Sequence, residues 1–222
     1  MSNTRKSHSK LVILILFIIA SLSMLMIYYG VLKPIKDSAA QAQNIKVNGI
    51  FLPTPQSLND FSLTDNSGKE FTKESLKGRW TLMFFGFTNC GIVCPTTMAA
   101  LNKMYRTLQE QLPDNRLPRI VMVSVDPERD TVARMNEYVS SFNPHFKGVR
   151  GDEAATDALE KQFHIAAAKM QAEGGKDQYT INHTAEILVI NPRGELQAFL
   201  SYPHKPEQMV KDYKALLSTG II

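Results

Sequence analysis

The chain has 222 residues, of which 44% are hydrophobic and 21% charged, as expected for a folded chain with room for a membrane segment and one domain. Its formal net charge is +4, but residues 1–33 hold four of the 25 Lys and Arg residues and none of the 21 Asp and Glu residues. The rest of the chain is therefore formally neutral. This balance argues against nucleic-acid binding, which needs clustered positive charge.

The N-terminal segment predicts a membrane anchor. Residues 11–29 (LVILILFIIASLSMLMIYY) form an uncharged apolar run that is long enough to span a bilayer as a helix. Basic residues precede it closely, at Arg5, Lys6 and Lys10. The positive-inside rule then predicts a single-pass inner-membrane protein with its C-terminal domain in the periplasm. A cleaved signal peptide is the alternative, because residues 40–42 (AQA) resemble a small-x-small cleavage site.

Three parts are expected along the chain: a tail and anchor over residues 1–33, a linker over 34–56 that contains several Pro, Gln and Asn residues, and a domain over 57–222. The domain is expected to open with a hairpin, whose strands at 61–64 and 70–72 flank the turn-forming sequence DNSG.

An alternation of strands and helices follows the hairpin. Strands are predicted at residues 80–87, 120–125, 184–190 and 195–200, and helices at 95–112, 132–142 and 155–163 and from Pro206 onward. This order is typical of a thioredoxin-like α/β domain, in which helices flank a central mixed sheet. The predicted fold class is therefore α/β, with an N-terminal hairpin extension and one preceding transmembrane helix.

The chain has only two cysteines, Cys90 and Cys94, which lie at the predicted turn from strand to helix. A disulfide between them would close a very short loop and add little stability, so redox or metal chemistry is the better interpretation. Pro95 follows Cys94, and we therefore expect Cys94 near the helix N-cap, where backbone N–H groups lower a thiol pKa. Three intervening residues give a wider bite than a CxxC redox pair, which suits a soft ion such as copper. Two inert cysteines are the alternative.

A copper site with two thiolates needs a third ligand, preferably an imidazole. Four of the five histidines have other interpretations: His8 lies in the cytoplasmic tail, His145 and His204 in surface loops, and His164 at a helix end. His183 stands at the mouth of a predicted strand, after the loop at 174–177, and is expected to face the cysteine turn. Position alone nevertheless favours an ordinary hydrogen-bonded histidine over a ligand.

Three motifs resemble the Sco/SenC proteins, which assist assembly of the dinuclear copper centre of cytochrome c oxidase. They are FTNCGIVCPTT at 87–97, VSVDPERDT at 123–131 and INHTAEILVINPRGE at 181–195, and the resemblance extends from about residue 55 to the C-terminus. It implies that Cys90, Cys94 and His183 bind one copper ion, as Cu(I), Cu(II) or both.

The resemblance further implies a metallochaperone rather than an enzyme. Its partners would be the copper-centre subunit of cytochrome c oxidase, a copper donor protein or thiol reductant, and the membrane through the N-terminal helix. The alternative hypothesis is a thiol–disulfide oxidoreductase, in which Cys90 and Cys94 are the redox-active pair and His183 is dispensable. The wide bite of the cysteine pair favours the chaperone.

The chain departs from the family pattern in two ways. Gly91, Ile92 and Val93 stand between the cysteines, where the family often has an acidic residue, and Asn182 stands where it usually has Asp. An acid before the histidine would orient or polarise the imidazole. Asp126 is interpreted as part of the signal that begins the next helix rather than as a ligand. Met170 is interpreted as an exposed loop residue rather than a ligand.

Overall fold

The computed structural model describes residues 3–33, 45–171 and 179–221. The chain forms two compact units, one up to Ile45 and one from Lys46 onward. In the first unit, helix α1 (Asn3–Ile27) continues into a short π-helical turn, η1 (Tyr28–Leu32). Residues Ile13–Leu32 are exposed, and they are apolar enough and long enough to cross a membrane. This helix could therefore anchor the protein in a membrane. The AQA sequence at 40–42 lies outside the described residues.

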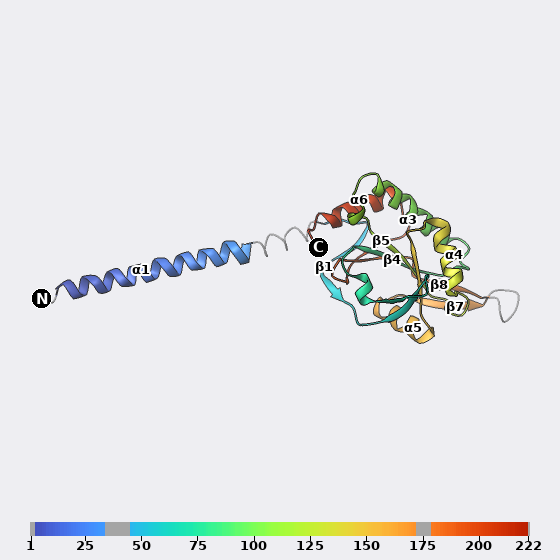
Figure 1. The fold of residues 1–222 in the computed structure, drawn as a ribbon, viewed down its shortest axis with the longest axis horizontal. Helices are drawn as coiled ribbons and strands as arrows, with labels where there is room; N and C mark the ends of the chain where they lie inside the picture. The colour runs from blue at the N-terminus through green and yellow to red at the C-terminus, as the bar shows by residue number, and fades with distance from the viewer. Residues whose placement is uncertain (1–2, 34–44, 172–178, 222) are drawn as a thin grey trace. The chain divides into compact units, whose positions relative to one another are not determined.

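The second unit is built on an eight-stranded sheet with the order β1-β10-β9-β4-β5-β6-β2-β3 (Figure 1). The strands are β1 (Gly49–Ser57), β2 (Ser62–Asp65), β3 (Glu70–Thr72), β4 (Thr81–Gly86), β5 (Arg119–Ser124), β6 (Lys147–Arg150), β9 (Ile187–Ile190) and β10 (Glu195–Leu200). The pairs β4–β5 and β5–β6 are parallel, whereas β9 is antiparallel to β4. The sheet is therefore mixed, as predicted.

Helices cover both faces of this sheet. They are α3 (Val93–Gln109), α4 (Val132–Phe142), α5 (Glu153–Gln162) and α6 (Pro206–Leu217), with short 3-10 helices η2 (Lys73–Leu76) and η3 (Asp114–Arg116). Helices α3, α4 and α6 lie on one side of the sheet and α5 on the other (Figure 1). Every residue of β4 and β9 is buried, which explains their continuous apolar sequences. The predicted α/β architecture is confirmed.

The sheet edges differ in how well the sequence predicts them. The predicted hairpin forms β2 and β3, which join the sheet through β6. At the other edge, β1 falls within the predicted linker except for Ser57, and it pairs with β10. Pro53 and Pro55 lie between the paired residues Phe51 and Gln56, where the register shifts. Proline is tolerated at such an irregular edge because it donates no ladder hydrogen bond.

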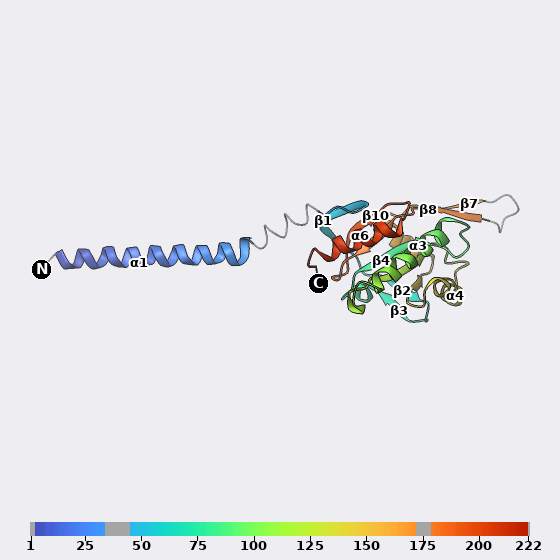
Figure 2. The ribbon, with the colours of Figure 1, turned by 90° about the horizontal axis from the view of Figure 1, so that it is seen from above.

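A separate two-stranded sheet precedes β9. Its strands, β7 (Ala167–Gln171) and β8 (Tyr179–His183), run antiparallel (Figure 2). The predicted loop at 174–177 lies outside the described residues. The strand predicted from Thr184 begins only at Ile187, so His183 ends the hairpin strand β8 rather than opening the central strand β9.

Candidate metal site

The two cysteines lie in the turn that leads from β4 to α3. Cys94 is fully buried and Cys90 partly buried, and both are free thiols. The N-cap of α3 is Ile92, so Cys94 lies inside the first turn and not at the cap as predicted. Its backbone N–H donates to Cys90 Sγ at 3.4 Å. The helix start therefore stabilises negative charge on Cys90 rather than on Cys94.

The two sulfur atoms differ in acidity. The hydrogen bond from the Cys94 thiol lowers the pKa of Cys90 to about 3, and the backbone N–H groups of Ile92 and Cys94 act in the same direction. The same hydrogen bond, together with burial, raises the pKa of Cys94 well above its usual value. At neutral pH the metal-free site therefore holds a Cys90 thiolate and a protonated Cys94.

The end of β4 leaves room for the buried sulfur only because residue 86 is glycine. A Cβ atom on Gly86 would lie 3.0 Å from Cys94 Sγ and 2.8 Å from Cε1 of Phe84. Both contacts are tighter than normal van der Waals packing. Gly86 thus allows the cysteine loop to pack directly on the central strand.

His183 reaches this sulfur pair from β8. Its Nε2 atom lies 3.4 Å from Cys94 Sγ, and its Nδ1 atom donates to the carbonyl oxygen of Thr184 at 2.9 Å. Because a carbonyl can only accept, this bond keeps the proton on Nδ1 and leaves the Nε2 lone pair facing the sulfur. The rings of Phe84 and Phe87 pack edge-on against the imidazole, with centroids 5.9 and 5.8 Å away.

Asn182 and Met170 lie on the opposite face of the hairpin from His183. Side chains alternate along a strand, so the residue before His183 faces the other way. Asn182 pairs with Ala168 and Met170 with Thr180, which places all four side chains on that second face. Both Asn182 and Met170 are exposed. The Thr184 carbonyl, rather than the side chain at 182, therefore orients the imidazole.

The other described histidines make different contacts. His145 stacks on Tyr105, His164 adopts a positive φ of 55° after α5, and Nε2 of His204 donates to the carbonyl oxygen of Ala185. The donor atoms of Cys90, Cys94 and His183 all lie within 4.8 Å of one another. The structure thus brings together the three predicted residues from segments 89 positions apart.

This donor set fits a soft metal ion. Bonds from a first-row metal such as zinc are about 2.3 Å to sulfur and about 2.0 Å to an imidazole nitrogen, so two ligands of one ion are at most about 4.6 Å apart. The three donor atoms lie within 4.8 Å of one another, so small movements toward a common centre would let them bind one ion. Two thiolates and one imidazole are ligands that suit copper.

Two buried acids lie behind the cysteine loop, and the sequence did not predict their supporting role. Asp130 accepts hydrogen bonds from the backbone N–H and the hydroxyl of Thr88 and from the hydroxyl of Ser124. Thr131, not Asp126, caps α4 by accepting from the backbone N–H of Arg134. Asp126 and Asp130 are fully buried, so this motif supports the site as well as starting a helix. Two acids directly after an apolar strand were the available signal.

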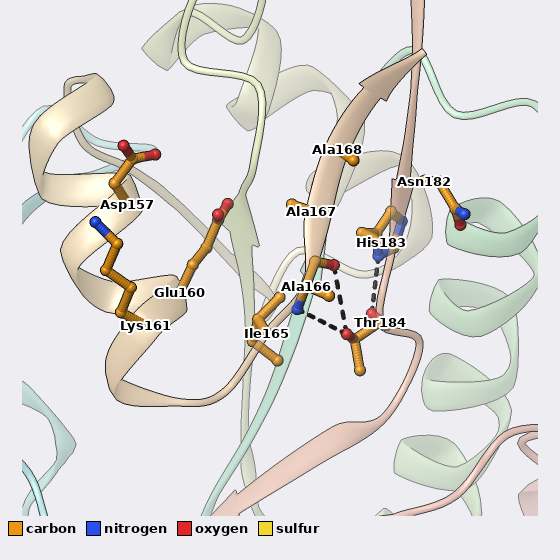
Figure 3. Close-up of a pocket in the computed structure, with 10 residues that line it drawn as sticks. All are labelled: Asp157, Glu160, Lys161, Ile165, Ala166, Ala167, Ala168, Asn182, His183 and Thr184. Carbon is orange, nitrogen blue, oxygen red and sulfur yellow. Dashed lines mark hydrogen bonds between the residues drawn. The ribbon is translucent and has the colours of Figure 1, made fainter.

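A cleft of about 570 Å³ opens beside His183, between α5 and β7 (Figure 3). Asp157 and Glu160 line it from α5, and Asn182, His183 and Thr184 line it from the hairpin. Burial raises the pKa of Glu160 to about 7, and the charge of Asp157 adds to this effect. The cleft gives solvent access to the histidine side of the site.

Known proteins match both the sequence and the fold. Residues 53–218 match the family SCO1/SenC. The mouse protein SCO2 homolog, mitochondrial, is 33% identical over 158 residues, which cover 70% of this chain and 60% of the mouse protein. The SCO2-like protein RC0895 of Rickettsia conorii is 26% identical over 204 residues, covering 90% of this chain and 93% of that relative.

Solved structures agree with these matches. ScoI of Bradyrhizobium japonicum with copper bound is 37% identical, with a TM-score of 0.63 over 70% of this chain and 96% of that one. The apo Sco1 protein of Thermus thermophilus is 32% identical, with a TM-score of 0.67 over 78% and 98%. The family match spans most of the chain and includes the cysteine turn, the buried acids and the histidine strand. The chain therefore belongs to the SCO1/SenC family.

Proposed function

We propose that this protein is a copper metallochaperone that helps assemble the copper centre of cytochrome c oxidase. One copper ion would be bound by the Sγ atoms of Cys90 and Cys94 and by Nε2 of His183. The observation that carries this proposal is the convergence of two sulfur atoms and one imidazole nitrogen within 4.8 Å of one another. Copper-bound structures of the Bradyrhizobium japonicum and Arabidopsis thaliana ScoI proteins support it.

The different acidities of Cys90 and Cys94 suit reversible copper binding. Cys90 is already ionised at neutral pH, so it offers a thiolate to an incoming ion without losing a proton. Cys94 would release its proton as the metal binds, and the Nε2 lone pair of His183 would complete a three-coordinate site. Because Cys90 is only partly buried and Ile92 is 75% exposed, an incoming thiolate can approach from that side.

The proposed topology and partner are supported by the apolar helix and by the family. The basic residues Arg5, Lys6 and Lys10 precede the apolar run, which supports a copper-binding domain on the periplasmic side of an inner membrane. There it would receive copper from a donor protein and pass it by ligand exchange to the copper-centre subunit of the oxidase.

Copper stoichiometry tests this proposal directly. The full-length chain in detergent micelles would be reduced, titrated with Cu(I) in competition with a chromophoric chelator, and compared with Cys90→Ser, Cys94→Ser and His183→Ala variants. We expect one copper per chain, lost with either cysteine and greatly weakened without His183. His145→Ala serves as the matched control, because His145 stacks on Tyr105 away from the sulfur pair. A His183→Ala protein with unchanged affinity would contradict the proposed ligand set.

A second candidate function is thiol–disulfide exchange, which the unequal acidities of the cysteines favour. The Cys90 thiolate would attack a target disulfide and form a mixed disulfide. Cys94, once deprotonated, would then displace the target as a dithiol and leave a Cys90–Cys94 disulfide that needs a thiol reductant to return. Reduction of an oxidised target peptide by stoichiometric protein measures this reaction. An unchanged rate in the His183→Ala variant would favour the reductase over the chaperone.

A further inference from the structure

The hairpin that carries His183 is attached to the domain mainly through side chains. Within the described residues, β7 and β8 pair only with each other and do not join the eight-stranded sheet. Four of the five residues of β7 are exposed, and Ile181 is the one buried residue of β8. Figure 2 shows the hairpin extending from the end of the domain. The position of His183 therefore depends on the side-chain contacts that β8 makes with the rest of the domain.

Tyr179 makes the first of these contacts. It lies four positions before His183 on the same face of β8. Its hydroxyl donates to the carboxylate of Asp126 at 2.7 Å, and a carboxylate oxygen of Glu128 lies 3.1 Å away. Burial and the bond to Asp126 raise the pKa of the Tyr179 phenol, so the hydroxyl keeps the proton that it donates. This bond joins β8 to the segment after β5.

Arg129 makes the second contact and reaches both ligand-bearing segments. Its Nε atom donates to Asp126 at 2.5 Å, and its Nη1 atom donates to the backbone carbonyl oxygen of Tyr179 at 3.0 Å. The guanidinium lies 3.7 Å from the centroid of the Tyr179 ring and 5.9 Å from that of Phe87. Phe87 precedes Cys90 by three residues and packs against His183.

We propose that Arg129 and Tyr179 form a clamp that positions His183 for copper and thereby sets how fast copper leaves the site. The inference rests on the proposed copper function. Neither residue is a ligand. Both are positioning residues. They hold β8 against the segment after β5, and the same segment supports the cysteine loop. With the clamp closed, the third ligand stays next to the sulfur pair. When it opens, the imidazole can withdraw and leave a two-coordinate copper ion open to exchange.

An exposed ion pair flanks the clamp, with Lys169 Nζ 5.3 Å from the centroid of the Tyr179 ring. Lys169 of β7 donates to Glu128 at 2.8 Å, and both side chains are about half exposed, at 44% and 55%. Exposed pairs of this kind contribute little because water and salt screen them. Lys169→Ala should therefore change the rate of copper release much less than loss of the shielded Tyr179–Asp126 bond does.

The test measures copper release with and without the third ligand. Full-length protein in detergent micelles, reduced and loaded with one equivalent of Cu(I), would be mixed with an excess of a chromophoric Cu(I) chelator. Tyr179→Phe removes one hydroxyl and should speed release about tenfold, as expected for loss of a hydrogen bond to a charged group. Tyr202→Phe is the matched control, because Tyr202 is 49% exposed, and it should release copper at the wild-type rate.

The same substitution in a His183→Ala background separates positioning from general loosening. If Tyr179 acts through His183, Tyr179→Phe has no further effect on release once the imidazole is gone. Equal acceleration in both backgrounds, or no acceleration in either, would overturn the clamp. Arg129→Lys gives a second probe, because an ammonium keeps the charge but cannot bridge Asp126 and the Tyr179 carbonyl while stacking on the ring. It should also speed release.

Failure of the copper function itself would be visible separately. If the wild-type protein bound no copper, amide hydrogen exchange on the metal-free chain would still test the clamp. Tyr179→Phe should then speed exchange in residues 167–171 and 179–183 while leaving β4 and β5 protected. Unchanged amide exchange in the hairpin would contradict the clamp whether or not the protein binds copper.

Discussion

The Nε2 atom of His183 lies 3.4 Å from the Sγ atom of Cys94, although 89 positions separate the two residues in the chain. Neither residue belongs to the eight-stranded sheet: Cys94 starts a helix, and His183 ends a strand of the separate hairpin. The site is therefore assembled from two segments held by different contacts. Substitutions that act on one segment should be distinguishable from those that act on the other.

The acidity of Cys90 predicts an unusual reactivity profile. Its pKa of about 3 means that the thiolate is fully formed throughout the range from pH 5.5 to 8. Alkylation of metal-free, reduced protein by iodoacetamide should therefore proceed at Cys90 at nearly constant rate, whereas an ordinary thiol with a pKa of about 8.5 would change more than a hundredfold. Mass spectrometry after quenching measures the rate. In Cys94→Ala, which removes the main cause of the low pKa, the ordinary pH dependence should return.

Gly86 should not tolerate a side chain. Gly86→Ala would place a methyl group 3.0 Å from Cys94 Sγ and 2.8 Å from Phe84. Overpacking of this kind costs about 1–3 kcal/mol, so the urea midpoint should fall. The displaced sulfur should also weaken Cu(I) binding. Gly91→Ala is the control, because a Cβ atom there meets nothing within 4 Å. Equal copper affinity in the Gly86→Ala and wild-type proteins would show that the packing against Cys94 is relaxed.

Asp130 should stabilise the cysteine loop through its acceptor oxygens. Asp130→Asn replaces one of two oxygens by an NH2 group, which faces the N–H of Thr88 or the hydroxyl of Ser124 instead of accepting from it. Leaving such a buried group unpaired costs about 1–3 kcal/mol of unfolding free energy. Equilibrium unfolding in urea checks this value, and Asp157→Asn, at an exposed position, is the control. A stability within error of the wild type would contradict the anchoring role.

Glu160 predicts a pH-dependent stability. Its pKa of about 7 lies above the ordinary value of 4.5, so the folded protein holds this proton more tightly than the unfolded chain. The resulting stability is present below about pH 4.5 and is lost as the pH rises through 7. Glu160→Gln should therefore be more stable than the wild type at pH 8, by about 1–2 kcal/mol after allowance for solvent screening, and equal to it at pH 4.5. Thermal unfolding at both pH values measures the difference, and an equal gain at both would point to another cause.

The sequence predicted the parts of the fold that have a strong local pattern. The central strands β4 and β9 are buried throughout, so their apolar runs were clear, and the stripe of Met98, Leu101 and Leu108 marked α3. Strand β1 was assigned to the linker because its prolines contradict a strand unless the position at the sheet edge is known. Strand β7 has the sequence AAKMQ, which favours a helix and becomes a strand through pairing with β8.

The three residues that meet in the candidate site could be predicted, but the contacts that support them could not. Cys90 and Cys94 were evident from spacing, and His183 from its place before a strand together with the family resemblance. Tyr179 and Arg129 meet across 50 positions of sequence, and no local periodicity reports such a contact. The orientation of Asn182 likewise depends on the register of β8, which only pairing with β7 establishes.

The hydrogen bond from His183 Nδ1 ends on the main-chain oxygen of Thr184, an atom that every amino acid supplies. Substitution at 184 can therefore change the side chain without deleting the acceptor, and position 182 takes no part in holding the ring. Substitutions at positions 182 and 184 should therefore preserve the histidine tautomer that a metal ligand needs. An Asp in place of Asn182 would therefore leave the same nitrogen facing the thiol pair.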